Sequence, residues 1–136
     1  MLIEQYVNTG KITFEFRDFA FLGPESTKAA EAGMCAEDQD RFWDFHDTVF
    51  ANQGSENKGY FSDGRLKDIA KQLDLDVDAF NKCFDDRVHE EDVVNSYDEG
   101  SALGVNRTPT LVINGELVQY SGGADLQAKI DEALAG

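Results

Sequence analysis

The amino-acid sequence predicts an α/β fold in which a block of helices lies between an early strand and a late β-hairpin. Residues 11–18 alternate apolar and polar side chains, which is the pattern of a half-buried strand. Residues 111–113 form a short apolar run typical of a strand buried on both faces, and Asn114-Gly115 is the signal of a type I′ hairpin turn. A second strand over residues 116–120 should therefore pair antiparallel with the first strand of the hairpin.

Amphipathic helices account for most of the remaining chain. Asp76 has the residue type of a helix N-cap, and Gly104 supplies the left-handed conformation that ends a helix. The helix over residues 38–52 carries two adjacent apolar stripes, which we expect to pack in the core rather than to form a cofactor site. The predicted helices cover residues 24–35, 38–52, 63–73, 77–84, 86–103 and 124–134, and residues 1–7 read as the last turns of another helix.

The composition is that of a globular and strongly acidic chain. Its 136 residues are 41% hydrophobic, which is enough for one domain with a core. The 27 acidic residues against 12 basic ones give a formal net charge of -15, which repels a phosphate backbone or an anionic membrane. No apolar stretch approaches the roughly 18 residues of a transmembrane helix. We therefore expect no nucleic-acid partner and no membrane contact from this chain.

The stretch over residues 104–115 indicates a family. It reads Gly-Val-Asn-Arg-Thr-Pro-Thr, then apolar residues and Asn-Gly. With the helix that follows, it resembles the cis-proline loop and closing hairpin of thioredoxin-fold proteins, and in detail the DsbA-type thiol-disulfide oxidoreductases. Residues 6–19, 23–32 and 42–47 are similar to the same family. The resemblance implies a thioredoxin-like fold with an inserted helical domain, in which residues 1–22 and 104–136 form the thioredoxin part and residues 23–103 form the insertion.

By resemblance, Arg107, Thr108 and Pro109 form the substrate-binding cis-proline loop. The backbone of Thr108 would pair with an extended peptide, and Pro109 has no N–H that could crowd a reactive sulfur. The partners implied are client proteins with cysteines or extended peptides, and no cofactor is implied. The family places the full-length protein outside the cytoplasm, in the periplasm or at the cell surface, although this chain contains no signal for it.

One departure from the family pattern concerns the reaction itself. The family begins with a strand and a Cys-x-x-Cys motif at the start of a helix, and this sequence contains no Cys-x-x-Cys. The thiolate of that motif is the attacking atom in disulfide exchange. We therefore expect a fragment with no catalytic residue of its own and without the N-terminal strand, and its status as an enzyme stays open. A second copy could also supply the missing strand in a dimer.

Cys35 and Cys83 are the two cysteines of the chain, and they are far apart in the sequence. With only two, they pair with each other or stay as free buried thiols. The resemblance favours a structural disulfide, since some DsbA-like proteins have one in this place. His46 and His89 are isolated in the sequence, and neither they nor the cysteines show a zinc spacing, so we expect no metal site.

Two alternative functions stay open. The first is a glutathione-using isomerase or kappa-type transferase of the same superfamily, in which a serine replaces the first cysteine. The second is a non-catalytic thioredoxin-fold module that holds extended peptides along the cis-proline loop. The residues at the missing motif would identify the first, and peptide binding without redox activity would identify the second.

Overall fold

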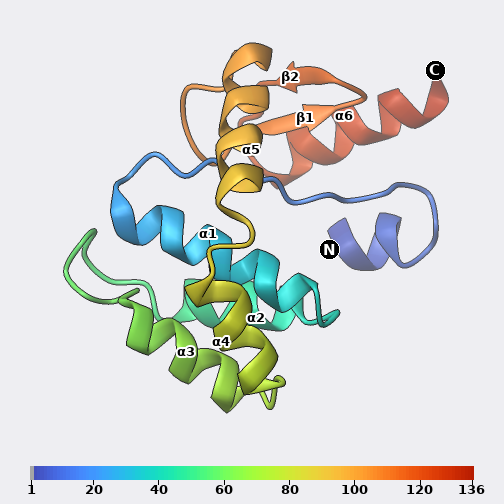
Figure 1. Cartoon of the computed structure of the whole chain (residues 1–136). Coiled ribbons are helices and arrows are strands. Elements are labelled where there is room, and N and C mark those ends of the chain that lie inside the picture. The colour runs from blue at the N-terminus through green and yellow to red at the C-terminus, as the bar shows by residue number, and fades with distance from the viewer. Residues whose placement is uncertain (1) are drawn as a thin grey trace. The chain divides into compact units, whose positions relative to one another are not determined.

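The computed structural model describes residues 2–136, and these divide into two compact units (Figure 1). A helical unit comprises residues 18–99, and a hairpin unit comprises residues 2–17 and 100–136. Met1, where the first predicted helix begins, lies outside the described residues. The elements in chain order are η1 (Ile3–Val7), α1 (Pro24–Glu37), α2 (Phe42–Ala51), α3 (Asp63–Gln72), α4 (Val77–Asp85), α5 (Glu90–Leu103), β1 (Leu111–Ile113), β2 (Glu116–Val118) and α6 (Gly123–Ala135).

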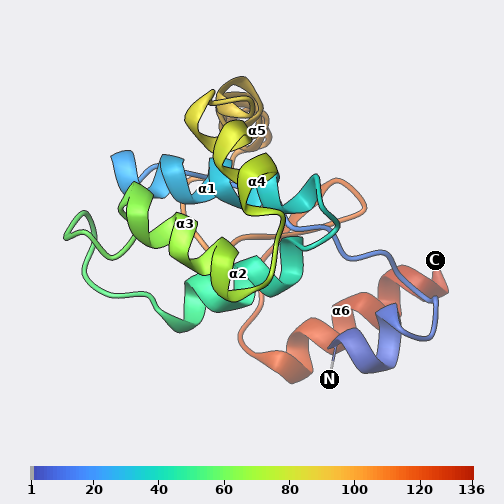
Figure 2. The same ribbon diagram turned by 60° about the horizontal axis from the view of Figure 1, so that its bottom comes forward.

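The helical unit is built around aromatic side chains that recur at helical spacing. Phe80 and Phe84, one turn apart on α4, are completely buried, and the Phe80 ring lies 5.6 Å from that of Phe45 on α2. Leu66 of α3 completes this core. Helix α1 packs against α2, α3 and α4 (Figure 2). Amphipathic helices form here because each has an apolar stripe that only the neighbouring helices can cover.

The helix boundaries follow local backbone rules. Asp76 caps α4 as predicted, since its carboxylate accepts a hydrogen bond from the backbone N–H of Ala79 at 3.0 Å. Helices α2 and α5 begin about one turn later than predicted. Asp40 and Arg87 adopt positive φ angles of 58° and 50°, so the chain turns at these two residues before each helix starts.

A buried charge pair lies within the helical unit. Glu31 of α1 is completely buried, and its carboxylate accepts two hydrogen bonds from Arg87, at 2.6 Å from Nη2 and 3.3 Å from Nε. This paired geometry compensates for the loss of water around the carboxylate. Arg87 also contacts Glu90 at 2.7 Å, which connects the pair to the first turn of α5.

The hairpin unit contains the two strands of the described chain. Strands β1 and β2 pair antiparallel, with Val112 opposite Leu117. Asn114 and Gly115 both have positive φ, at 50° and 87°, which confirms the predicted type I′ turn. Helix η1 is fixed to α6 by a hydrogen bond from the Tyr6 hydroxyl to Asp131 at 2.7 Å.

Two predictions about strands are wrong. Residues 11–18 have the alternating pattern of a strand but form none, because no strand among residues 2–136 pairs with them. The second concerns β1, which is not buried on both faces, since Val112 is 42% exposed. The sequence pattern measures side-chain polarity alone, whereas a strand needs a hydrogen-bonding neighbour and a buried face needs a covering layer. Strand β2 also ends at Val118, before the predicted Tyr120.

Candidate functional site

The loop that leads into the hairpin is positioned by the end of α5. Gly104 has a φ of +98°, and the backbone N–H of Val105 bonds to the carbonyl of Gly100 at 2.9 Å, which turns the chain out of the helix. The Thr108–Pro109 peptide bond is cis, as the resemblance implied.

Two hydrogen bonds hold side chains of the loop in place. The Arg107 guanidinium donates to the side-chain carbonyl of Gln119 at 2.7 Å, and the Thr110 hydroxyl donates to the backbone carbonyl of Arg107. Thr108 and Pro109 are exposed, and no described residue hydrogen-bonds to Thr108. The backbone of Thr108 is thus free to pair with an added chain. The three loop residues expected from the sequence lie together.

An exposed apolar surface follows the loop on the hairpin. Val112 and Leu117 are opposite each other in the register and are 42% and 39% exposed. Residues opposite each other across an antiparallel pair project from the same face of the sheet. The loop and this face together present free backbone groups next to apolar side chains, which is the arrangement that an added extended strand requires.

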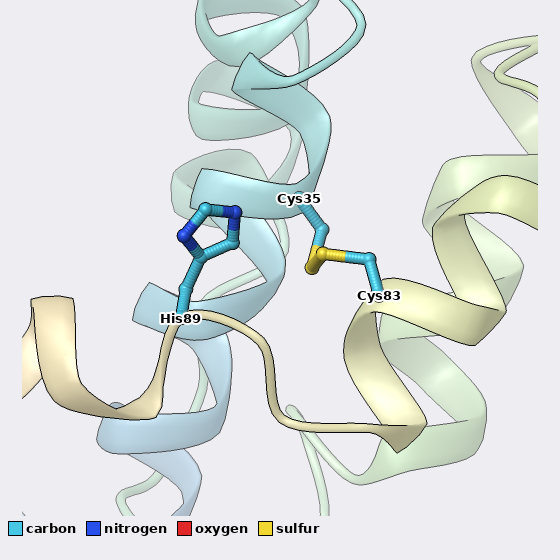
Figure 3. A group of neighbouring side chains, drawn as sticks. All are labelled: Cys35, Cys83 and His89. Atoms are coloured by element: carbon cyan, nitrogen blue, oxygen red, sulfur yellow. A yellow bond between two sulfur atoms is a disulfide. The ribbon is translucent and has the colours of Figure 1, made fainter.

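The two cysteines form a disulfide in the helical unit. Cys35 of α1 and Cys83 of α4 are joined by an S–S bond of 2.03 Å, with their Cα atoms 5.9 Å apart (Figure 3). The reading of two free thiols is therefore wrong, because the packing of α1 against α4 brings the side chains together. The structural disulfide that the resemblance favours is confirmed, so the chain contains a joined cysteine pair although its two cysteines are 48 positions apart.

A third side chain lies beside this disulfide. The segment between α4 and α5 places His89 so that one of its ring nitrogens and both sulfur atoms lie within 4.8 Å of one another (Figure 3). The Nε2 atom of His89 is 2.7 Å from Asp38, and Nδ1 is 2.7 Å from Asp92. Burial lowers the pKa of His89, but the two carboxylate contacts outweigh this effect and the pKa is raised overall. Sequence spacing gave no sign of this cluster, since helix packing alone assembles it.

His46 occupies a different environment from His89. It packs among the rings of Phe42, Trp43 and Phe50 on α2, with the Phe50 ring centroid 4.6 Å away. Of the two stripes expected to form the core, only the one that contains Phe45 is buried, whereas Trp43 and Phe50 are 45% and 55% exposed. The second stripe is therefore exposed at Trp43 and Phe50, whereas the His46 side chain is only 19% exposed.

Comparison with known proteins identifies the family. Residues 1–132 match the family profile described as thioredoxin, and the chain therefore belongs to the thioredoxin family. Within it, the chain is a homologue of DsbA-like disulfide bond formation proteins. It is 31% identical over 137 residues to a probable disulfide bond formation protein D of Bacillus anthracis, a match that covers 98% of this chain and 63% of the relative. The chain thus spans less than two thirds of that relative.

Two solved structures share the fold. The oxidised form of BdbD from Bacillus subtilis has a TM-score of 0.88 at 24% identity, covering 99% of this chain and 75% of that one. The thiol-disulfide exchange protein α-DsbA2 from Wolbachia pipientis has a TM-score of 0.77 at 34% identity, covering 96% and 70%. The prediction of a thioredoxin-like fold is confirmed. Within residues 2–136, no helix has the length and apolar character needed to cross a bilayer.

Proposed function

We propose that this chain carries the client-binding part of a DsbA-like thiol-disulfide oxidoreductase that exchanges disulfides with cysteine-containing proteins. The observation that carries the proposal is the exposed loop at Thr108 and Pro109, whose backbone is unpaired beside the apolar hairpin face. The similarity to disulfide bond formation proteins supports it. The chemistry of the full-length protein would occur outside the cytoplasm, where disulfides persist.

An extended client segment would bind by adding to the edge of the hairpin unit. Its backbone would exchange hydrogen bonds with the N–H and C=O of Thr108, and alternate client side chains would contact Val112 and Leu117. Pro109 has no backbone N–H, so no hydrogen-bond donor at this position would obstruct the approach of a client sulfur. Recognition through the backbone suits an enzyme with many clients, because it does not depend on client sequence.

The attacking thiolate would come from residues that this chain does not contain. Its cysteines are joined to each other in the helical unit, and no Cys-x-x-Cys occurs among the 136 residues. A thiolate at a helix N-terminus is the nucleophile in this chemistry. On this proposal the chain binds clients but exchanges their disulfides only together with such a segment.

Backbone pairing is tested with a client peptide that is N-methylated at one residue at a time. Methylation removes one N–H donor, and we expect binding to weaken about five- to tenfold at alternate residues only, because every second N–H of an extended strand faces its partner. Fluorescence anisotropy of the labelled peptide measures the affinity. The unaffected positions are the internal control, and equal effects at all positions would contradict strand addition.

The redox part is tested by comparing this chain with a version extended upstream in its source gene. We expect insulin reduction and dithiol oxidation only by the extended version. Peptide binding with no redox activity in either version would favour the non-catalytic binding module. Activity of the short chain would show that Cys35 and Cys83 are themselves catalytic.

A further inference from the structure

The cluster of Cys35, Cys83 and His89 is separate from the proposed client-binding loop. Each residue offers one atom that metal ions bind, and the three atoms lie within 4.8 Å of one another (Figure 3). We propose that reduction of the disulfide converts this cluster into a binding site for zinc or a similar soft divalent ion. The chain would then bind metal as a dithiol and release it as a disulfide.

The chemistry of the three ligands selects the type of ion. Two thiolates and an imidazole are the donors that zinc binds in tetrahedral sites, whereas magnesium and calcium prefer oxygen. At a zinc–sulfur distance of about 2.3 Å, the sulfur atoms of a tetrahedral site lie about 3.8 Å apart. The Cα atoms of Cys35 and Cys83 are 5.9 Å apart, so both side chains can reach one ion once the S–S bond is broken.

The surroundings of His89 match those of a histidine that binds a metal. Its Nδ1 atom lies 2.7 Å from the Asp92 carboxylate, and its Nε2 atom lies 2.7 Å from the Asp38 carboxylate. A metal ion at Nε2 would replace the proton on that nitrogen, and the Asp92 contact would still hold the ring. Metal-bound histidines usually have such a carboxylate on the second nitrogen. His89 therefore has both a ligand atom near the sulfurs and a partner that orients it.

Asp38 is suited to the fourth position. Its Oδ2 atom lies 3.7 Å from the Cys83 sulfur and 2.7 Å from the His89 Nε2 atom. After reduction, a thiolate at Cys83 would face this carboxylate, and a divalent cation between them would remove the repulsion. Water could take the same position, since Asp38 is about half exposed.

Reduction requires a dithiol reductant, which supplies two electrons. A reductant thiolate attacks the sulfur of Cys83, which is only partly buried, and the S–S bond breaks so that Cys35 leaves with the electron pair and takes a proton. The second reductant thiol then attacks the mixed disulfide, releases Cys83 as a thiol and leaves the reductant as a cyclic disulfide. One divalent ion displaces the two thiol protons and forms two metal–sulfur bonds.

Cobalt(II) serves as a spectroscopic probe of the site, because its absorption spectrum distinguishes tetrahedral coordination by thiolates from other kinds of coordination. The chain is reduced with dithiothreitol, freed of reductant without oxygen, and titrated with cobalt. We expect one equivalent to produce a thiolate-to-cobalt band and intense visible bands, and zinc to displace them. The oxidised chain should produce neither. Absence of the thiolate band in the reduced chain would overturn the proposal.

Variants distinguish a site that includes His89 from metal binding by the two cysteine thiols alone. His89→Gln should weaken cobalt binding at least about tenfold, and Asp92→Asn should weaken it less, because that residue orients a ligand without being one. His46→Gln is the matched control, since His46 is the other histidine of the chain and should leave affinity unchanged. Equal affinity of His89→Gln and the unchanged chain would overturn the assignment.

Thermal unfolding keeps the test valid if reduction loosens the fold. Zinc should raise the melting temperature of the reduced chain, because an ion that binds only the folded state stabilises it. The increase should be smaller in reduced His89→Gln and absent in the oxidised chain. An equal increase in the two reduced proteins would show binding by the thiols alone and would contradict the site. None of these measurements depends on client binding.

Discussion

Arg87 illustrates how one side chain allows a charge to be buried. Glu31 is completely buried, and Arg87 is 38% exposed while it neutralises the carboxylate. We expect Arg87→Met to lower the free energy of unfolding by about 2–4 kcal/mol, because the Glu31 charge would stay buried without its partner. Urea denaturation followed by the fluorescence of Trp43, the one tryptophan of the chain, measures the loss.

Lys82 provides the matched control for this pair. It forms an ion pair with Asp86 at 2.6 Å, but both side chains are exposed, so Lys82→Met should have a much smaller effect than Arg87→Met. The double variant Glu31→Met with Arg87→Met should recover most of the loss, since it buries no charge. Similar losses in Lys82→Met and Arg87→Met would contradict the role of burial.

The raised pKa of Asp18 predicts that the stability of the chain depends on pH. Burial, together with repulsion from Glu37, raises the pKa of Asp18 to about 6, although His46 partly opposes this. In the unfolded chain the pKa is near 3.8, so between about pH 4 and 6 the folded state retains a proton that the unfolded state has lost. Stability contributed by this residue therefore falls as the pH rises through that window.

Replacing the carboxyl group tests this prediction. Asp18→Asn should be more stable than the unchanged chain at neutral pH by about 1–3 kcal/mol, and the difference should vanish near pH 4. Urea denaturation across this range provides the measurement. Asp98→Asn, at an exposed position of α5, is the control variant, and an equal gain in stability in both variants at neutral pH would contradict the assignment to Asp18.

At the scale of elements, glycines show where the backbone rather than packing determines the structure. Gly115 has a φ of +87° in the hairpin turn, and an added Cβ would contact nothing within 4 Å. We expect Gly115→Ala to lower the free energy of unfolding by about 1–2 kcal/mol. The surrounding space would accommodate the added Cβ, but a left-handed backbone conformation is unfavourable for any residue that has one. Chemical denaturation followed by far-ultraviolet circular dichroism measures the change.

Gly64 is the control for that substitution. It lies in α3 with equal space for a Cβ but without a positive φ. Gly64→Ala should therefore stabilise the chain by about 0.5–1 kcal/mol, since alanine favours helix more than glycine does. A gain at both positions would show that the hairpin turn does not require glycine at position 115.

The helices and strands also show which sequence patterns predict an element correctly. The helices predicted between residues 24 and 134 are confirmed, because an amphipathic helix satisfies its own backbone hydrogen bonds. The strand predicted over residues 11–18 is wrong, because a strand depends on a neighbour that local sequence does not specify. The hairpin is confirmed because its partner strand follows directly after the turn.

For the whole molecule, the disulfide closes a loop of 48 positions and restricts the unfolded chain. On the chain-entropy model this stabilises the fold by about 4 kcal/mol. We expect Cys35→Ala with Cys83→Ala to lose about that amount, measured by urea denaturation with Trp43 fluorescence. The reduced, unchanged chain without metal should behave like the double variant. If reduction leaves the unfolding midpoint unchanged, the disulfide does not stabilise the helical unit.

The sequence by itself determined the helices, the hairpin turn, the loop at Pro109 and the family, because these depend on local backbone preferences and short motifs. It determined the loop residues Arg107, Thr108 and Pro109 as a group, since they are adjacent in the chain. Only the tertiary structure decided the joining of Cys35 to Cys83, the contact of both with His89 and the burial of Glu31. Those residues come from α1, from α4 and from the segment between α4 and α5, and they meet because α1 packs against α4.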